Sequence, residues 1–345
     1  MERAKRKRLN WLFLFIAFSI LTVLAWLVIG FSQDYRNIPA QPLIGNRPST
    51  VAALKQEGFP FSFLVMGDTT GRETAESLIR MALQEGEPSL MVILGDFVRK
   101  PDIWNHRFFL TEMTAEIRPP IPIFLVAGNH DVDYTSRKVT QAERRVTREV
   151  YESLYGAMHF DFVFNECLFI ICGVDLKRPT DSLAYLRNVL SIKGGGRKHI
   201  FVFVHYPPKG LAEHIEGSLP ISHTEFFSLL ESHKVTSCFF GDYHGYWRGQ
   251  RKGVNYIVTG GGGRFYRLQP EWGRFHHILK VTVDHDRIAE GVVTTQGDLG
   301  LEDRLEEKVF TFLFPIVQNR FWILYFIFAI FLIGSGYSAF RLLKT

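Results

Sequence analysis

The chain has 345 residues, enough for one large domain or two small ones, and its 46% hydrophobic content with 31 Phe suggests membrane segments in addition to a core. The net charge of +5 is concentrated in residues 1–10, which hold five basic residues and one acid, so the rest of the chain carries only +1. This distribution gives no support for nucleic-acid binding, because the charge belongs to a terminal tail and not to a basic face of a domain.

Residues 11–31 form an uncharged apolar segment directly after the basic tail at 1–10. A helix of this length, at about 1.5 Å per residue, covers a hydrocarbon core of about 30 Å. A cleavable signal peptide has a shorter apolar stretch of about 7–15 residues, so we interpret 11–31 as an uncleaved transmembrane helix, with cleavage near Ala40 as the alternative. Residues 32–58 are then predicted to be a linker to a folded domain at 59–305.

The chain then alternates between short apolar runs and segments with helical periodicity. The run at 61–66 ends in Gly-Asp, and apolar residues at helical spacing follow within 72–86. Continuous apolar strands that alternate with helices are typical of α/β proteins whose sheets are buried on both faces. Further helices are predicted at 102–117 and 137–155, and a hairpin is predicted to turn at Asn165–Glu166. The predicted strands lie within 61–71, 89–96, 121–131, 159–175, 198–208, 235–245, 254–263, 276–283 and 287–296.

Five of these runs end in residues of types that commonly bind metals. In α/β folds, ligands gather beyond the carboxyl ends of strands. Carboxylate, amide and imidazole groups are donors for divalent metals such as Mn²⁺, Fe and Zn²⁺. A single Gly-Asp is explained equally well by a helix N-cap, but five such ends in series favour a shared site. The residues are Asp68, Asp96, Asn129 with His130, His205, and Asp242 with His244.

A second uncharged segment, 321–340, is followed by a short basic tail at 341–345 and is also predicted to be a transmembrane helix. Basic residues flank both segments on their terminal sides. By the positive-inside rule, both termini are expected in the cytoplasm and the domain on the extracytoplasmic face, in a periplasm or a lumen. Residues 306–320 form a juxtamembrane segment, whose apolar part at 309–317 is either an interfacial helix or the start of a kinked span.

The order of the motifs resembles that of the calcineurin-like metallophosphoesterase superfamily, over about 61–293. The most specific pieces are Gly-Asn-His-Asp at 128–131 and Val-His-Tyr-Pro-Pro at 204–208. The resemblance implies an α/β fold, a four-layer αββα sandwich, here flanked by an N-terminal and a C-terminal transmembrane helix. It also implies two divalent metal ions at one rim and hydrolysis of phosphate mono- or diesters.

The resemblance further implies roles for the residues at the strand ends. His130 would protonate the leaving group and would be oriented by Asp131. The metal ligands would be Asp96 as a bridge between the ions, Asp68 and His244 on the first ion, and Asn129, His205 and Asp242 on the second.

The chain departs from the family pattern at two ligand positions. The family usually has His where Thr70 stands, and a second His where Asp242 stands. An additional carboxylate favours the harder ions Mn²⁺ or Fe over Zn²⁺. Thr70 is a poor ligand, so the first ion is expected to have water there or to bind weakly. Arg99 stands where the purple-acid branch has a Tyr, so that branch fits poorly.

These features leave two hypotheses for the function. The first is a membrane-integrated phosphoesterase that acts on a phosphorylated small molecule or a lipid-linked phosphate. The alternative, motivated by Thr70, is a catalytically impaired pseudo-enzyme that binds metal or phosphate as an assembly or scaffold protein. Arg248, Arg264 and Arg267 follow the last motif and are either a solvated basic face or groups that hold the substrate phosphate.

Overall fold

We describe the fold from a computed structural model, which describes residues 2–34, 38–55, 58–134, 145–263, 270–295, 301 and 321–344. The chain divides into two units, which are treated separately below. One unit joins residues 1–38 with 301–345, and the other is the domain at 39–300.

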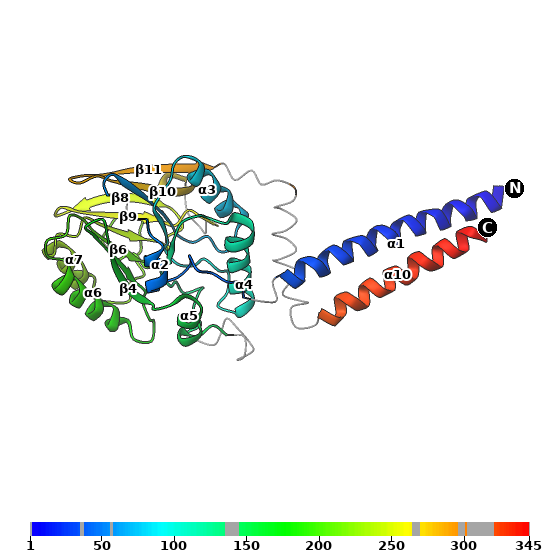
Figure 1. The fold of residues 1–345 in the computed structure, drawn as a ribbon, viewed down its shortest axis with the longest axis horizontal. Coiled ribbons are helices and arrows are strands. Elements are labelled where there is room, and N and C mark those ends of the chain that lie inside the picture. Colours follow the sequence, from blue (N-terminus) through cyan, green and yellow to red (C-terminus); the bar gives the residue numbers. More distant parts are fainter. Residues whose placement is uncertain are drawn as a thin grey trace. The chain divides into compact units, whose positions relative to one another are not determined.

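Two mixed sheets form the centre of the domain (Figure 1). The strands are β1 (Phe61–Met66), β2 (Leu90–Ile93), β3 (Ile123–Leu125), β4 (His159–Phe164), β5 (Cys167–Cys172), β6 (Ile200–Val204), β7 (Ser237–Phe240), β8 (Tyr246–Arg251), β9 (Val254–Thr259), β10 (His276–Val283) and β11 (Ile288–Thr295). The first sheet has the order β11-β10-β1-β2-β3, and the second has the order β4-β5-β6-β7-β9-β8. Strands β1 to β3 are parallel to one another, as are β5, β6, β7 and β9.

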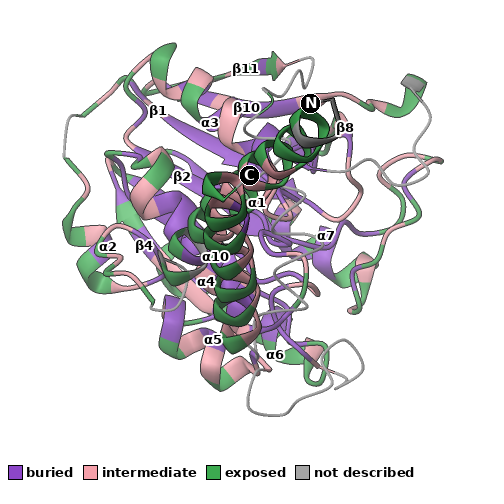
Figure 2. Ribbon diagram, turned by 90° about the vertical axis from the view of Figure 1, so that its right-hand side faces the viewer, coloured by how far each residue is buried: buried purple, intermediate pink, exposed green. Residues whose placement is uncertain are grey.

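Aromatic side chains fill the space between the two sheets. Phe63 of β1 meets Phe169 of β5 and Phe201 of β6 edge to face, with ring centroids 5.3 Å and 5.0 Å away. The inner strands β1 to β3, β5 to β7 and β9 are accordingly buried almost throughout, and buried segments are purple in Figure 2. This double burial explains why they read as continuous apolar runs in the sequence.

Helices cover the outer face of each sheet. A core cluster joins the first sheet to α3 (Glu73–Gln84), α4 (Ile103–Thr111) and α5 (Arg148–Tyr155). A second cluster joins the other sheet to α6 (Pro179–Lys193) and α7 (His223–Ser232). The predicted four-layer αββα order is therefore confirmed.

Two of the helices illustrate how the local sequence sets the elements. The buried residues of α3 include Ala75, Leu78, Ile79 and Ala82, which recur at helical spacing and form the face that packs on the sheet. Helix α4 begins after Asp102, whose Oδ1 accepts hydrogen bonds from the N–H groups of residues 104 and 105, at 3.0 Å each. A π-helical turn, Glu112–Ile117, continues α4. Of the predicted helix at 137–155, residues 137–144 lie outside the described residues.

The linker predicted at 32–58 is wrong for its second half, which folds onto the domain. Asn46 is buried there, and its amide donates hydrogen bonds to the carbonyls of Leu125 and Ala157, at 2.7 Å and 2.9 Å. A short helix, α2 (Pro48–Ala52), follows. The segment is also anchored by backbone bonds, such as that from the N–H of Gly45 to the carbonyl of Ile123 at 2.8 Å, and contacts of both kinds with distant residues leave no periodicity in the sequence.

The terminal unit contains α1 (Glu2–Asp34) and α10 (Phe321–Leu343). Both are long and apolar enough to cross a membrane, and their side chains are mostly exposed (Figure 2). Trp11 lies against Tyr337, with ring centroids 5.8 Å apart, and Gln33 donates a hydrogen bond to the hydroxyl of Tyr325 at 2.7 Å. The two helices are therefore antiparallel, and both chain termini lie at the same end of the pair (Figure 1). The predicted juxtamembrane segment at 306–320 lies outside the described residues.

Small residues allow α1 and α10 to approach closely. The hydroxyls of Ser19 and Ser335 share a hydrogen bond of 2.8 Å across the pair, and a Cβ at Gly334 would lie only 2.8 Å from the ring of Phe18. Small side chains and hydroxyl bonds are the usual means of helix association in membranes.

We therefore expect Gly334→Leu to force the helices apart. The measurement is disulfide cross-linking in membranes between cysteines placed at Ser19 and Ser335, which should fall several-fold in the Leu variant. Gly336→Leu is the matched control, because a Cβ at Gly336 would meet nothing within 4 Å. Equal cross-linking in both variants would contradict the helix pairing.

Candidate metal centre

The carboxyl ends of five strands meet at one rim of the sandwich. Loops that begin at these ends carry Asp68 after β1, Asp96 after β2, Asn129 and His130 after β3, His205 after β6, and Asp242 and His244 after β7. Because β1 to β3 are parallel, as are β6 and β7, their ends point the same way and present these residues together.

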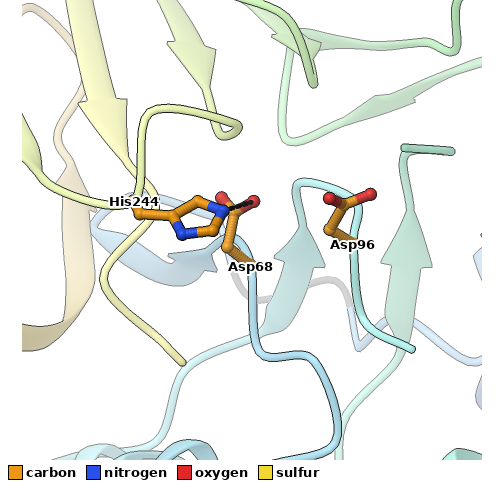
Figure 3. A group of neighbouring side chains, drawn as sticks. All are labelled: Asp68, Asp96 and His244. Carbon is orange, nitrogen blue, oxygen red and sulfur yellow. Dashed lines mark ion pairs between the residues drawn. The ribbon is translucent and has the colours of Figure 1, made fainter. Parts of the chain in front are cut away.

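Asp68, Asp96 and His244 form one group of candidate ligands. One side-chain atom from each lies within 4.8 Å of the others, and His244 Nε2 is 3.4 Å from Asp68 Oδ1 (Figure 3). Figure 3 shows the imidazole of His244 directed at Asp68, with the carboxylate of Asp96 beside it on the neighbouring loop. The sequence predicted Asp68 and His244 as ligands of the first ion and Asp96 as the bridge between the two ions.

His205 joins this group to Asp242. Its Nε2 lies 3.5 Å from Asp96 Oδ1 and 3.6 Å from Asp242 Oδ1. Its Nδ1 is 2.7 Å from the carbonyl oxygen of Leu94, so Nδ1 carries the proton and donates it to that oxygen. The lone pair of a neutral His205 is then on Nε2, directed at the carboxylates, as a metal ligand requires.

The residues of this rim fit a pair of divalent cations. Asp68 Oδ1 and His205 Nε2 are buried and have no hydrogen-bond partner. A buried polar atom without a hydrogen-bond partner is costly, and a pair of cations, one at each atom, would satisfy both. The set combines carboxylates with imidazoles, which suits Mn²⁺, Fe or Zn²⁺. Asn129 lies in the loop next to His130, at the same rim.

The charges at the rim support the same conclusion. Burial raises the pKa of Asp68 well above its usual value, and the carboxylates of Asp96 and Asp242 add to this effect. Burial alone would lower the pKa of His205, but the negative charges of Asp96, Asp68 and Asp242 outweigh it and raise the pKa to about 9. Without a cation the cluster retains protons, so metal binding should release them.

Asp242 occupies the position where the family usually has His, and the fold holds it in place. Its N–H donates to Asp68 Oδ2 at 2.9 Å, and its Oδ2 accepts a hydrogen bond from the hydroxyl of Ser218. Its Oδ1 therefore remains directed at His205. Sequence reasoning missed Ser218, because no motif marks it and it lies 24 residues before Asp242.

The backbone at the rim is strained. Of ten described non-glycine residues with a left-handed backbone, five lie here. Each such residue costs on the order of 1–3 kcal/mol, and such strain is concentrated at functional sites. The five are Asp68 (φ 58°), Thr70 (φ 49°), Asp96 (φ 49°), Asp242 (φ 61°) and His244 (φ 53°). Thr70 has a buried hydroxyl without a hydrogen-bond partner, and its N–H donates to the carbonyl of Asp96 at 2.9 Å.

His130 lies at the outer edge of the rim and is partly exposed. Its backbone N–H donates to Asp96 Oδ1 at 2.8 Å, and its Nε2 is 3.9 Å from Asp96 Oδ2. Its Nδ1 lies 2.7 Å from the carbonyl oxygen of Arg99, which orients the ring.

Asp131 does not orient His130, so this part of the sequence prediction is wrong. The buried carboxylate of Asp131 accepts four hydrogen bonds from backbone N–H groups, two of which belong to Asp96 and Gly128, at 2.7 Å and 2.8 Å. The other two belong to Phe97 and Val98, at 3.0 Å and 3.2 Å. Asp131 therefore fixes the loop that carries Asp96. Burial, with the charge of Asp96, raises the pKa of Asp131 to about 7.

The arginines proposed to hold phosphate are not brought to the metal ligands by any described contact. Arg248 lies on β8, where its guanidinium is paired with Glu290 and also contacts Asn255. Arg264 and Arg267 lie outside the described residues.

Comparisons with known proteins extend this description. Residues 61–246 match the calcineurin-like phosphoesterase family. No curated protein is significantly similar to the sequence. A solved purple acid phosphatase, PPD1 from yellow lupin (Lupinus luteus) seeds, superposes with a TM-score of 0.52 at 14% identity, over 72% of this chain and 55% of that one. The chain thus corresponds to about half of the lupin enzyme's length.

Two further solved structures superpose on this chain. GAP50, described as the anchor in the inner membrane complex of Plasmodium, has a TM-score of 0.50 at 14% identity, over 69% of this chain and 86% of that one. A dimetal phosphatase from Danio rerio has a TM-score of 0.47 at 17% identity, over 68% and 98%. With the family match covering more than half of the chain, the conclusion is that this protein belongs to the calcineurin-like phosphoesterase family.

Proposed function

We propose that the domain hydrolyses phosphate mono- or diesters with two divalent cations held at the rim. The observation that carries this proposal is the convergence of two buried ligand atoms without hydrogen-bond partners, Asp68 Oδ1 and His205 Nε2, beside Asp96 and Asp242. A structural role alone would leave these atoms unsatisfied at a cost of about 1–3 kcal/mol each.

Each residue has a task in this mechanism. Two bound cations would polarise the phosphoryl oxygens and lower the pKa of an attacking water. Asp96 lies between His205 on one side and the Asp68–His244 pair on the other, which suits a bridging ligand. His130 keeps one ring nitrogen on the carbonyl of Arg99, so its other nitrogen, when protonated, is free to give a proton to the leaving oxygen.

The proposed ions are Mn²⁺ or Fe in preference to Zn²⁺. Asp68, Asp96 and Asp242 bring three negative charges against four positive ones, and hard ions prefer an oxygen-rich set. Asp242, which stands where the family usually has His, adds the third negative charge and so shifts the preference from Zn²⁺ toward the harder ions.

The proposal includes attachment to a membrane by α1 and α10. The antiparallel pair places both termini at one end, where the basic residues of 1–10 and 341–345 favour the cytoplasm. The domain would then lie on the extracytoplasmic face. A lipid-linked phosphate would reach a tethered domain at the membrane surface, so we include it among the proposed substrates.

The lipid-linked substrate has its own test. Intact lipid-linked phosphates and their water-soluble head groups would be compared with full-length protein in bilayers. Faster cleavage of the lipids supports the proposal, and equal rates would exclude it.

The proposed function is tested with full-length protein in detergent, Mn²⁺, and one aryl phosphate monoester and one diester. Hydrolysis of either ester should be lost with a chelator and restored by Mn²⁺. Activity that is indifferent to the chelator would contradict the two-ion mechanism.

The role of His130 is tested by His130→Asn. Turnover should fall by roughly 10²–10⁴-fold, as is typical for general acid–base groups, while metal content stays unchanged. The loss should be smaller for an aryl ester, whose leaving group needs no proton, than for an alkyl ester. Equal losses for both esters would exclude His130 as the acid.

A second candidate function is a scaffold protein that binds metal or phosphate without turnover. It is favoured by Thr70 at a usual ligand position and by the likeness in fold to GAP50. The two candidates differ in one result. A wild-type protein that binds metal but hydrolyses neither ester, and that gains hydrolysis with Thr70→His, would favour the scaffold.

A further inference from the structure

A pocket of about 420 Å³ opens directly beside the candidate metal ligands Asp242 and His244, which form part of its wall. The rest of its lining includes Pro207, His214, Ile215, Glu216, Tyr243 and Trp272. In the proposed function the metal centre holds the phosphate of the substrate. These remaining pocket residues have no role in that metal centre. The pocket is therefore placed to receive whatever is esterified to that phosphate.

Three aromatic rings gather in this pocket. The ring of His214 is nearly parallel to that of Trp272, at 16°, and 5.8 Å separates their centroids. Tyr243 lies between the two metal-ligand candidates in sequence, 5.8 Å from the ring of His214. The hydroxyl of Tyr243 donates to the carbonyl of Trp272 at 3.3 Å, which ties the loop after β7 to the turn at Pro270–Trp272. The position of Trp272 is thus linked to the loop that carries the ligands.

Trp272 remains 37% exposed despite these contacts. A large aromatic side chain at the wall of a pocket offers a flat apolar face on which a ring can stack. Ile215 and Pro207 add apolar surface to the same wall.

The charge of the pocket limits what it can hold. Among the lining residues that the structure describes, Glu216 and Asp242 are acidic, and neither a lysine nor an arginine is present. Asp242 is a proposed metal ligand, so Glu216 is the remaining acid of the wall, and no lysine or arginine among the described lining residues would offset its repulsion of a second phosphate or a carboxylate. The pocket therefore suits an uncharged group.

We infer that this pocket binds the organic group of the phosphoester, and that the preferred substrates carry an uncharged ring which stacks on Trp272 and Tyr243. This inference rests on the proposed function, because it assigns the phosphate to the metal centre. It makes Trp272 a residue that determines specificity, while the chemistry at phosphorus stays with the strand-end ligands.

The test uses phosphonates, which are not hydrolysed, and measures their binding to Mn²⁺-loaded full-length protein by calorimetry. Wild-type protein should bind phenylphosphonate roughly tenfold more tightly than methylphosphonate, the size of effect expected for one aromatic contact. Trp272→Ala should remove this preference and leave methylphosphonate binding unchanged, whereas Trp272→Phe should keep most of it. A carboxylate on the ring, in 4-carboxyphenylphosphonate, should weaken binding.

The outcomes separate the two proposals. If wild-type protein binds neither phosphonate, the proposed function fails. If it binds the phenyl and methyl compounds equally, or if Trp272→Ala keeps the preference, the pocket inference is overturned while the metal centre stands. Binding of the carboxylated ring that is as tight as that of the phenyl compound would overturn the restriction to uncharged groups.

Discussion

Asp96→Asn is expected to remove bound metal and phosphoesterase activity together while the domain stays folded. Asparagine keeps an oxygen that can accept the N–H of His130, now 2.8 Å from Asp96 Oδ1, so the local structure should survive. The loss of metal affinity should exceed the roughly 10–100-fold that follows removal of an outer-shell partner, because Asp96 is proposed to contact both ions. Metal content, hydrolysis and thermal unfolding would be measured on the same preparation.

The matched control for this variant is Asp286→Asn, which alters an exposed acid in the loop between β10 and β11. It should leave metal content and hydrolysis unchanged. Full metal occupancy in Asp96→Asn would exclude Asp96 as a bridging ligand.

Asp131→Ala should destabilise the domain by about 3 kcal/mol or more. Its carboxylate accepts the N–H groups of four residues, and alanine would leave these buried donors without partners, at about 1–3 kcal/mol for each that finds no water. For a domain of this size, such a loss lowers the melting temperature by roughly 6–12 °C. The measurement is thermal unfolding of full-length protein in detergent, followed by near-ultraviolet circular dichroism.

His130→Asn is the control for Asp131→Ala, because it should lower turnover without changing the melting temperature. A loss of turnover in Asp131→Ala without a lower melting temperature would exclude the structural role of Asp131. If Asp131→Ala keeps the wild-type melting temperature and loses turnover as His130→Asn does, Asp131 acts through His130, as the sequence alone suggested.

The convergence of the candidate metal ligands at one rim could be predicted from the sequence because its signals are local. Asp68, Asp96, His205 and Asp242 each follow an apolar run that is buried on both faces, and the end of a parallel strand fixes where such a residue lies. The alternation of strands and helices predicted the α/β class, and the four-layer order was what the family resemblance implied. Helix α6 carries Leu183, Leu186, Val189 and Leu190 on its buried face, a periodicity that the sequence also contains. No helix was predicted at Pro179–Lys193, although this periodicity indicates one.

The remaining features depend on contacts between residues that are distant in sequence. Asn46 binds the backbone of Leu125, 79 positions later, and His130 is oriented by the carbonyl of Arg99, a group that every residue has. Strand β8 is an edge strand whose side chains are mostly polar, so it lacks an apolar pattern. The pocket is lined by Tyr243 and by Trp272, 29 residues later, which the fold brings into contact.

The central claim is tested most directly by the metal content of the purified full-length protein. Mn²⁺ would be supplied at purification, the protein would be exchanged into metal-free buffer, and its metals would be measured by mass spectrometry. Two divalent ions per chain are predicted, with fewer in Asp96→Asn. Absence of Mn²⁺, Fe and Zn²⁺ in the wild-type protein, or equal content in both proteins, would contradict a metal centre at this rim.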